Sequence, residues 1–392
     1  MKPLETITVL EFSTMITASL ASMMLAEQGA RVIKVEPMAM GDPMRYIGSR
    51  KEDISALFAN CNRGKQSLRI DLKSELGIQV IKDMMPSVDI VIHNFRPGVM
   101  DRIGLGSEAL RALNPKLIYA AISGFGTTGP MRDAPAYDPI IQAHAGIAAT
   151  QGQGDQPAFM RTLLCDKITG YTACQAVTSA LFMRERTGMG QHIDLSMIDS
   201  GLFFIFLDGF QNHTLLSDDH ERAGMLIDIL YDPWVCSDGG VVISAGSYEM
   251  QKRFLTSIDM PHLLDDPRFA TFENQMRHIQ TLKALVAERC RELSCDDMVA
   301  RLRAVDVPCA KVMTREEVLA QAQLEANGCV DVYDHPIAGK SRRILAPPMF
   351  GGERLQPGTG APGHGEHSQQ VLESFGLSDT TIDELKAKAV VT

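Results

Sequence analysis

Short hydrophobic runs alternate with helix-like segments over the first part of the chain. The runs are rich in β-branched residues and are bounded by glycine, proline or polar residues, as buried strands are. We expect such strands at 6–12, 30–36, 88–95 and 116–123. Apolar positions at helical spacing fill the intervening stretches 18–29, 74–85 and 107–114. Strands that alternate with helices over short connections predict an α/β protein whose parallel sheet is covered on both faces.

The pattern continues beyond residue 160 and then changes. Apolar or small residues at 170, 173, 174, 177, 180 and 181 predict a helix over 166–183, with stop signals at Gly188 and Gly190. The segment 192–198 has the pattern of a further strand. Residues 208–224 turn polar and are expected to be a linker. A second unit follows, which opens with the strand-like 239–246 and continues in amphipathic helices.

Composition restricts the class of protein. The 392 residues carry a formal net charge of −10, which argues against a general nucleic-acid binder because such proteins present a basic face. Eight cysteines are scattered without any C-x-x-C pair, a pattern typical of free thiols in a reducing cytosol rather than of disulfides or a zinc site. The opening MKPLETITVLEF lacks the regions of a signal peptide, and no uncharged stretch is long enough to span a bilayer. We therefore expect a cytoplasmic protein without a metal, a nucleic-acid partner or a membrane partner.

One glycine motif requires a test against a dinucleotide site. GFGTTGP at 124–130 matches G-x-G-x-x-G and follows a predicted strand. That fingerprint requires its third glycine to open a helix whose N-terminus holds the pyrophosphate. Pro130 follows at once, and the turn after the first strand, where such glycines normally lie, contains none. The sequence therefore disfavours a nicotinamide or flavin.

A cationic group surrounds the end of the third strand. NFRPGVMDRIGLG at 94–106 leaves this strand at its carboxyl end, the edge at which open α/β sheets bind ligands. Arg96 and Arg102 flank a Pro-Gly turn and can face one anion, with Lys65 and Lys73 as further cations from a neighbouring connection. The alternative is that all four are ordinary solvated surface charges.

One carboxylate, Asp166, is unusual because of its surroundings. In RTLLCDKITG at 161–170 it follows an apolar run and precedes an Ala-rich helical segment. As an N-cap it would satisfy backbone N–H groups of the helix, and as a buried structural acid it would pair with Arg161 or Lys167. As a nucleophile it would be kept ionised by the helix terminus in a dry pocket. Local sequence alone favours the cap, which does not exclude the nucleophile.

Several of these motifs occur together in one known family. The segments VLEF…MMLAEQGARVIKVE, NRGKQSLRIDLK, NFRPGVMDRIGLG, GFGTTGP, AYD and CDKITGYTACQAVTSALFMRERTGMGQHIDLSM resemble the family III CoA-transferases. This is the superfamily of formyl-CoA transferase, carnitine CoA-transferase and the alpha-methylacyl-CoA racemases. DDPRF, VDVPCAKV, HPIAG and APGHGEHS extend the resemblance through the C-terminal half. Each motif alone is weak, whereas their order and spacing together are specific.

The resemblance implies a catalytic role for Asp166. In the transferases the aspartate at this position attacks the acyl-CoA thioester to give a mixed anhydride, which the released CoA thiolate converts to an aspartyl-CoA thioester. An acceptor acid then repeats both steps in reverse order, so CoA moves between acids without ATP. N–H donors for the tetrahedral intermediates are expected from the turn around Ile16 and Thr17.

The resemblance also implies a site for coenzyme A, bound as a substrate and not as a permanent cofactor. Residue by residue, the family's CoA contacts fall on Ile16, Thr17, Ile70, Asp71, Leu72, Lys73, Asn94, Phe95, Arg96, Arg102, Ala136, Tyr137 and Asp138. The chain departs from the family at Pro37, where a cationic residue is common, and Arg45 is the candidate substitute. A glycine-rich loop that shields the intermediate in formyl-CoA transferase is not recognisable at 223–233. Four methionines suit either an acyl pocket or a core, namely Met15, Met38, Met40 and Met44.

The fold that the resemblance implies is a Rossmann-like large domain made from both ends of the chain. The large domain is expected at 1–207 and 326–392, the linker at 208–224 and a smaller α/β domain at 225–325. Two such chains are expected to form an interlocked homodimer, each threaded through the other. The implied partners are an acyl-CoA and a small carboxylic acid.

Two other functions compete with CoA transfer. An acyl-CoA racemase of the same superfamily uses a histidine base in a G-H-D motif, but the matching stretch here is AYD, with Tyr137 in place of the histidine. A tyrosine with its ordinary pKa of roughly 10 is a poor base at neutral pH. His144 is interpreted as a core or helix residue. A non-catalytic CoA-binding protein is disfavoured because Asp166 and the anion-binding motifs are intact together.

Overall fold

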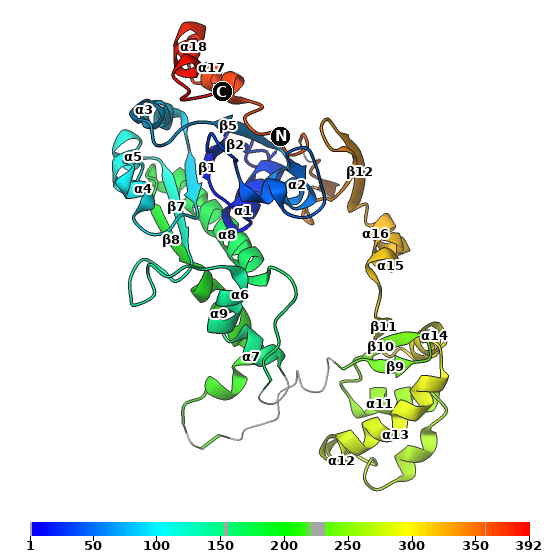
Figure 1. Ribbon diagram of the computed structural model, residues 1–392. Coiled ribbons are helices and arrows are strands. Elements are labelled where there is room, and N and C mark those ends of the chain that lie inside the picture. Colours follow the sequence, from blue (N-terminus) through cyan, green and yellow to red (C-terminus); the bar gives the residue numbers. More distant parts are fainter. Residues whose placement is uncertain (1, 153–155, 218, 221–231, 357) are drawn as a thin grey trace. The chain divides into compact units, whose positions relative to one another are not determined.

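The structure is a computed structural model that describes residues 2–152, 156–217, 219–220, 232–356 and 358–392 (Figure 1). The chain divides into two compact units. Unit 1 comprises Met1–Asp208 and Asn327–Thr392, and unit 2 comprises Gly209–Ala326. Residues 218 and 221–224 of the expected linker lie outside the described residues. Residues 223–231, which make up most of the stretch 223–233 where the family's glycine-rich loop is not recognisable, also lie outside the described residues.

Unit 1 is built on a six-stranded parallel sheet with the order β5-β2-β1-β6-β7-β8. Its strands are β1 (Thr8–Phe12), β2 (Arg31–Glu36), β5 (Lys65–Arg69), β6 (Ile90–His93), β7 (Ile118–Ser123) and β8 (His192–Ser196). The predicted α/β class and parallel sheet are confirmed. Strand β5 was not predicted, because the sequence KQSLR was interpreted as part of a cationic connection.

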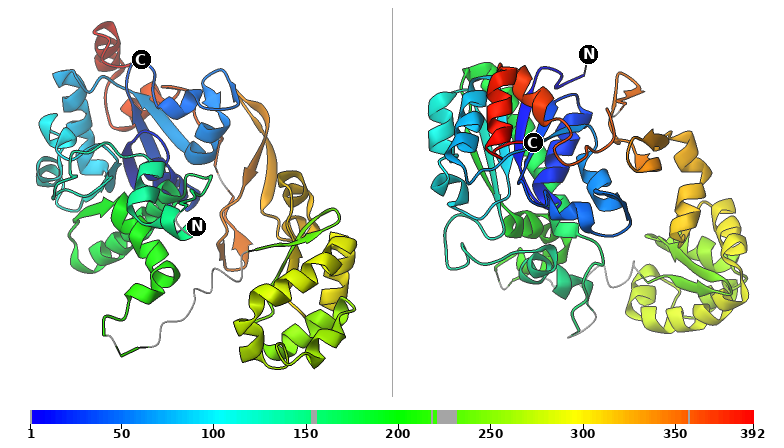
Figure 2. Two further views of the ribbon diagram at one scale, coloured as in Figure 1. Left: turned by 60° about the horizontal axis from the view of Figure 1, so that its bottom comes forward. Right: turned by 45° about the horizontal axis from the view of Figure 1, so that its top comes forward.

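Helices cover both faces of this sheet, and alternate strand residues face opposite layers. On one face Val9, Val32 and Ile92 pack against α1 (Thr17–Glu27) and α8 (Leu164–Thr187). On the other face Leu10, Ile33 and Leu68 pack against four helices (Figure 2). These are α3 (Glu75–Met84), α5 (Ser107–Leu113), α17 (Ser368–Ser374) and α18 (Asp379–Ala387).

Shorter elements complete unit 1. Between β2 and β5 lie η1 (Pro43–Tyr46), β3 (Arg50–Lys51), β4 (Ile54–Ser55) and α2 (Ala56–Asn62). Farther along are η2 (Met85–Ser87), α4 (Val99–Arg102), α6 (Asp138–His144) and α7 (Ile147–Gln151). After β8 comes α9 (Met197–Gly209), which crosses the unit boundary, and η3 (Gln211–His213) follows in unit 2. The returning chain adds β12 (Val330–His335), β13 (Gly339–Ile344), β14 (Met349–Phe350) and β15 (Glu353–Arg354).

Both ends of the chain contribute to unit 1. Ile70, just after β5, forms an antiparallel bridge with Val391. The backbone N–H of Gly365 donates to the hydroxyl of Ser67 at 2.8 Å, and the side chains of Val371 and Leu372 join the same apolar cluster as the central strands. The final helices therefore close one face of a sheet whose strands all lie in the first half of the chain.

Unit 2 has its own sheet and its own core. The antiparallel sheet has the order β11-β10-β9, from β9 (Trp234–Cys236), β10 (Gly239–Ile243) and β11 (Cys309–Lys311). Its helical elements are α11 (Tyr248–Ser257), η4 (Pro261–Asp265), α12 (Phe272–Arg277), α13 (Ile279–Glu292), α14 (Cys295–Ala304), α15 (Arg315–Ala320) and α16 (Ala322–Ala326). Within the described ranges, no helix is both long and apolar enough to cross a membrane.

Candidate active site

The carboxyl ends of β1, β6 and β7 border a cavity of about 290 Å³ in unit 1. This is the edge at which open parallel sheets bind ligands. Eight residues that the sequence analysis assigned to catalysis or CoA binding line it together: Thr17, Asn94, Phe95, Arg96, Ala136, Tyr137, Asp138 and Asp166. They come from segments far apart in the chain, so the fold assembles a polar and partly charged cavity from separate loops and helix starts.

Asp166 lies in the first turn of α8 and faces the cavity. The hydroxyl of Thr17, the first residue of α1, donates a hydrogen bond to its Oδ1. The pKa of Asp166 is raised to about 6, chiefly by burial and also by the nearby carboxylate of Asp138, which together outweigh the lowering by the Thr17 hydrogen bond and Lys167. The carboxylate is thus poorly solvated yet ionised at neutral pH, as an oxygen nucleophile has to be.

The interpretation of Asp166 as an N-cap is wrong. The N-cap of α8 is Leu163, which makes no side-chain cap bond. Instead the backbone N–H of Asp166 donates to Oδ2 of Asp138 at 3.1 Å, and the amide of Gln142 donates to the other oxygen of Asp138 at 2.6 Å. Asp138, which is buried, therefore satisfies the helix start from another helix and leaves the Asp166 carboxylate free of that task.

A glycine brings α8 close to α1. A Cβ atom on Gly170 would lie 2.9 Å from the carbonyl oxygen of Thr17 and 3.2 Å from Cδ2 of Leu20. Since the first neighbour is backbone, any larger residue has to push the two helices apart. Gly170 lies one turn after Asp166 in α8, so the same close approach places Asp166 against Thr17.

The loop between β1 and α1 is held in an unusual conformation. Met15 has a φ of +63°, in the left-handed region that residues other than glycine rarely adopt. Its backbone N–H donates to Oδ1 of Asp42 at 3.1 Å. Asn94 holds the preceding residue from both sides, accepting from the N–H of Thr14 at 3.1 Å and donating to its carbonyl at 2.7 Å. These contacts fix the loop that leads into Thr17.

A buried ion cluster supports this loop from below. Nζ of Lys34 lies 2.7 Å from Oε1 of Glu11 and 2.9 Å from Oδ2 of Asp42, and Nζ of Lys65 lies 2.7 Å from Oε2 of Glu11. All four side chains are fully buried. Burial alone would raise the pKa of Glu11, but the two lysines outweigh burial and hold that pKa well below its usual range.

Two cations assigned to ligand binding from the sequence are instead structural. Lys65 belongs to this ion cluster, and burial lowers its pKa to about 8 even beside Glu11. Arg45 is fully buried, with its guanidinium 2.6 Å from Glu36 and 3.1 Å from Asp53. Arg45 therefore cannot replace the cation missing at Pro37, because its charge is already neutralised out of reach of solvent.

The remaining predicted contacts do not line this cavity. Ile16 and Ile70 are buried in apolar clusters, so their side chains are not available to a ligand. Leu72 packs partly against the core, and Lys73 is exposed. Asp71 accepts a hydrogen bond from the backbone N–H of Lys73 at 2.9 Å.

Three arginines at or near the cavity have no acidic partner among the described residues. Arg96 and Arg132 line it, and Arg132 and Arg102 both reach toward Gly98, where a built Cβ atom would lie 3.8 Å and 3.3 Å from their respective nitrogens. Among the described residues, none of the three forms an ion pair. Unpaired guanidinium groups at a cavity are suited to phosphate or carboxylate oxygens.

Sequence reasoning missed Arg132 and other residues of the cavity wall. Arg132 lies in the irregular stretch after GFGTTGP, a stretch in which no helix begins before Asp138. The one feature of the sequence that could have identified Arg132 is its position four residues before the AYD motif. The wall residues Ser123 and Met197 carried no signal of their own, and of the four methionines considered for an acyl pocket only Met15 lines this cavity.

The family model described as CoA-transferase family III matches residues 4–368. The chain therefore belongs to CoA-transferase family III, and its class of enzyme is CoA-transferase. The resemblance inferred from the motifs is confirmed. No group of three or more His, Cys, Asp or Glu residues in the described ranges is arranged to hold a metal ion.

Individual relatives agree over most of the chain. The chain is 30% identical to the succinyl-CoA–D-citramalate CoA-transferase of Chloroflexus aurantiacus, over 100% of this chain and 98% of the relative. It is 36% identical to the acetyl-CoA:oxalate CoA-transferase of Acetobacter aceti, over 72% of this chain and 73% of the relative. A crystal structure of a CaiB/BaiF family protein from Brucella suis matches with a TM-score of 0.85 at 31% identity, covering 95% of this chain and 99% of that chain.

Proposed function

We propose that the protein moves CoA from an acyl-CoA thioester to a free carboxylic acid through covalent intermediates on Asp166. The observation that carries this proposal is the Asp166 carboxylate itself. It faces the cavity, accepts a hydrogen bond from Thr17 and has no lysine or arginine within ion-pair distance in the described structure. A carboxylate that merely stabilises the fold would be paired, as Glu11 is.

The proposed chemistry balances with these groups alone. The Asp166 carboxylate attacks the thioester carbonyl and expels CoA thiolate, leaving a mixed anhydride. The thiolate then attacks the aspartyl carbonyl carbon, which releases the donor acid and leaves an aspartyl-CoA thioester. The acceptor carboxylate attacks this thioester and expels CoA thiolate, which leaves a second mixed anhydride between Asp166 and the acceptor. The thiolate finally attacks the acceptor acyl carbon of this anhydride, which forms the new acyl-CoA and frees the Asp166 carboxylate. Exclusion of water protects the anhydride from hydrolysis.

Different residues at and near the cavity are proposed to bind CoA and to stabilise the reaction intermediates. The three unpaired arginines suit the phosphates of CoA, with Arg102 and Arg132 meeting over Gly98. The proposed CoA contacts at Thr17, Asn94, Phe95, Arg96 and 136–138 line the same cavity as Asp166. Backbone N–H groups at the start of α1 are proposed to stabilise the tetrahedral intermediates. Coenzyme A acts here as a substrate.

The test is exchange of CoA between a labelled ester and a panel of free acids. The panel includes succinate, oxalate and branched-chain acids, because the relatives' names couple succinyl-CoA and acetyl-CoA to small di-acids. Wild-type protein treated with its acyl-CoA and then with borohydride or hydroxylamine should gain a mass shift on the peptide that contains Asp166. An Asp166→Asn protein that still folds and exchanges CoA at a substantial rate would contradict the mechanism.

The same assay distinguishes CoA transfer from the alternative function, racemisation of an acyl-CoA. Tyr137, which replaces the histidine base, is 67% exposed. His144 ends α6 and stacks edge-on against Phe125 at 5.3 Å. A racemase would incorporate deuterium from solvent at the α-carbon of an acyl-CoA, with no exchange of CoA onto acids. We expect CoA exchange without α-deuteration.

We further propose that two chains form a homodimer, interlocked as the family resemblance implies. Helix α9 supports this, because Phe203 and Leu207 are 77% and 78% exposed and neighbouring aromatic residues are also exposed. A large apolar helix face is normally covered. If the chains interlock, dissociation requires unfolding, so sedimentation at nanomolar concentration should show a dimer. A folded monomer on dilution would exclude interlocking.

A further inference from the structure

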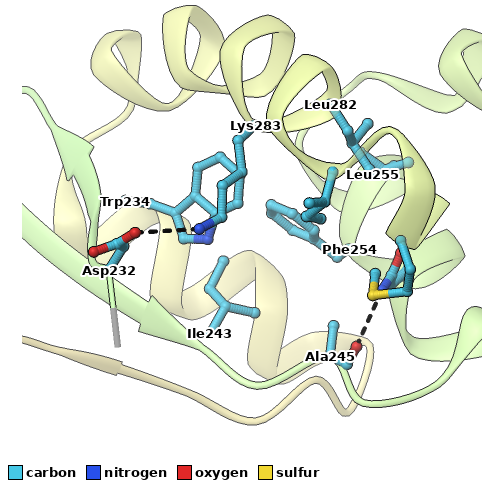
Figure 3. Close-up of a pocket in the computed structure, with 11 residues that line it drawn as sticks. Asp232, Trp234, Ile243, Ala245, Phe254, Leu255, Leu282 and Lys283 are labelled. Atoms are coloured by element: carbon cyan, nitrogen blue, oxygen red, sulfur yellow. Dashed lines mark hydrogen bonds and ion pairs between the residues drawn. The ribbon is translucent and has the colours of Figure 1, made fainter. Parts of the chain in front are cut away.

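Two buried glutamines of unit 2 show how a side-chain amide is satisfied locally. Nε2 of Gln251 donates to the carbonyl of Ala245 at 3.4 Å, which the dashed line at Ala245 in Figure 3 marks. Nε2 of Gln275 donates to the carbonyl of Phe269 at 2.9 Å. Each partner lies six residues before its glutamine, and Oε1 of neither glutamine has a partner among the described residues. These amides therefore contact only nearby backbone and connect no distant segments.

Gln142 of unit 1 makes a different set of contacts. It lies on α6 and is 1% exposed. Its Oε1 accepts from the backbone N–H of Met160 at 3.0 Å. Its Nε2 donates to Oδ1 of Asp138 at 2.6 Å and to the carbonyl oxygens of Met160 and Thr162 at 3.1 Å and 3.2 Å, so three acceptors share two hydrogens. One side chain thus joins α6 to backbone that lies 18 and 20 residues further along the chain.

The backbone that Gln142 holds leads directly into the helix of the candidate nucleophile. Residues 156–162 are exposed, so apolar packing does not fix them. Leu163, the N-cap of α8, makes no side-chain cap bond, and Asp166 lies in the first turn. Hydrogen bonds from other segments therefore have to set where α8 begins. Gln142 supplies three of them within the exposed stretch.

A second connection to α8 runs through Asp138. Its buried carboxylate accepts from Gln142 at Oδ1 and from the backbone N–H of Asp166 at Oδ2, the latter at 3.1 Å. Without the amide, Oδ1 would lose the donor that the described structure gives it, so the carboxylate has to turn or draw in water. Its bond to the Asp166 N–H is then disturbed as well. Because the Asp138 charge also raises the pKa of Asp166, its direction affects the nucleophile too.

We propose that Gln142 is a positioning residue for CoA transfer: through Asp138 and the backbone before α8 it keeps the Asp166 carboxylate facing the thioester. This inference rests on the proposed role of Asp166 as the nucleophile. Gln142 is not among the residues that line the cavity, so it touches neither CoA nor the acid. Its removal should therefore slow the first chemical step and leave the binding of acyl-CoA almost unchanged. A displacement of about 1 Å at a reacting group can cost roughly 100-fold in rate.

Gln142→Met is the direct test, because methionine has nearly the same length and volume but lacks the amide donor and acceptor. In a single turnover with acyl-CoA, followed by borohydride, the mass shift on the peptide with Asp166 should appear roughly 30- to 100-fold more slowly than in wild type. In the steady state, kcat for CoA exchange should fall as well, while KM for the acyl-CoA stays within about threefold of wild type. A higher KM with an unchanged kcat would make Gln142 a binding residue and overturn the proposal.

Asn114→Leu is the matched control. Asn114 donates to the carbonyls of Met85 and Val88 at 3.1 Å and 2.8 Å, and it accepts from the backbone N–H of Lys116 at 3.0 Å. It makes a comparable set of backbone contacts in unit 1, but it lies just before β7 begins, at the opposite edge of the sheet from the cavity. Asn114→Leu should lower stability and leave the rate of the mass shift unchanged. An equal slowing in both variants would assign the effect to general destabilisation and overturn the proposal.

Gln142→Asn keeps the proposal testable if Gln142→Met does not fold. Asparagine retains an amide but is one methylene shorter, so it cannot reach Asp138 and the 160–162 backbone together. We expect the mass shift to appear about tenfold more slowly or worse, with KM again close to wild type. Folded Gln142 variants that gain the mass shift at the wild-type rate overturn this inference alone. If wild type itself gains no mass shift at Asp166, the proposed nucleophile is wrong and the inference falls with it.

Discussion

Glu11 and Asp166 of unit 1 are both largely shielded from water, yet their surroundings shift the pKa of the two carboxylates in opposite directions. Beneath the loop, Glu11 is buried between two lysines, which hold its pKa well below the usual range against the effect of burial. At the start of α8, Asp166 has a threonine hydroxyl as its close partner, and burial raises its pKa to about 6. The difference separates a charge that holds the fold together from one that is kept available for reaction.

The cations of unit 1 divide in the same way. Lys34, Lys65 and Arg45 are buried and paired with acids. Arg96 and Arg132 line the cavity, Arg102 lies near Arg132 at Gly98, and none of the three forms an ion pair among the described residues. Paired charges are expected to affect stability when removed, and unpaired charges are expected to affect binding and rate. Each of the following predictions tests one side of this division.

The largest effect is expected when one charge of the buried ion cluster is removed. Glu11→Gln leaves Lys34 and Lys65 buried without their shared acid, so the free energy of unfolding should fall by about 3–5 kcal/mol. Glu384→Gln, on the exposed surface of α18, is the control and should change it by less than about 0.5 kcal/mol. Denaturant unfolding at neutral pH measures both. A Glu11→Gln protein as stable as wild type would abolish the distinction.

On the unpaired side, Arg102→Ala should weaken CoA binding. Loss of one charge-assisted phosphate contact costs about 1.5–3 kcal/mol, so KM for the acyl-CoA should rise by roughly 10- to 150-fold with kcat much closer to wild type. Arg291→Ala, at an exposed position of α13, should leave both unchanged. Steady-state kinetics with varied acyl-CoA concentration tests this prediction. An unchanged KM in Arg102→Ala would show that Arg102 does not contribute to CoA binding.

The sign of a stability change also distinguishes the two carboxylates. The folded pKa of Asp166, about 6, lies above its ordinary value of 3.8, so the folded state binds its proton more tightly and loses stability as pH rises from about 4 to above 6. Asp166→Asn removes that loss. The variant should be more stable than wild type by about 1–3 kcal/mol at pH 8, with no gain near pH 4. Unfolding at both pH values tests this, and a loss of stability at pH 8 would contradict it.

The smallest effect is expected at Thr17. Its hydroxyl stabilises the ionised form of Asp166, so Thr17→Val should raise that pKa further. The acidic limb of the kcat/KM profile, where Asp166 gains a proton, should then move to higher pH by less than about one unit. Thr17→Ser, which keeps the hydroxyl, should restore the wild-type limb. An equal shift in both variants would assign the effect to packing.

Sequence patterns predicted the parts of unit 1 whose residues are apolar and locally periodic. The strands β1, β2, β6, β7 and β8 and the helix from 164 to 187 all have such patterns. Strand β5 does not, because three of its five residues are charged or amide-bearing, and its lysine is buried only through a partner on another strand. Arg45 misled for the same reason, since no local pattern reveals that Glu36 and Asp53 enclose it.

The candidate site shows the same limit. Asp166 was found because an acid after an apolar run is locally unusual, and the family motifs strengthened that choice. Its capping role was assigned wrongly, because the carboxylate that satisfies the helix start belongs to Asp138 on a different helix. Arg132 lies in an irregular loop that has no periodicity to analyse. Local sequence thus identifies unusual residues, whereas their partners depend on tertiary contacts.

Unit 1 is interrupted in the chain by the whole of unit 2, and this has a consequence during synthesis on the ribosome. The helices that cover Leu68 and Ile70 contain Val371, Leu372 and Ile382, which are made only after unit 2. At about 5–20 residues per second, translation of 209–326 alone takes on the order of ten seconds. Throughout that time α3 and α5 already cover part of this side of the sheet, but the apolar residues that α17 and α18 cover stay exposed. The nascent chain is therefore expected to need a chaperone just when its candidate catalytic loop has already emerged.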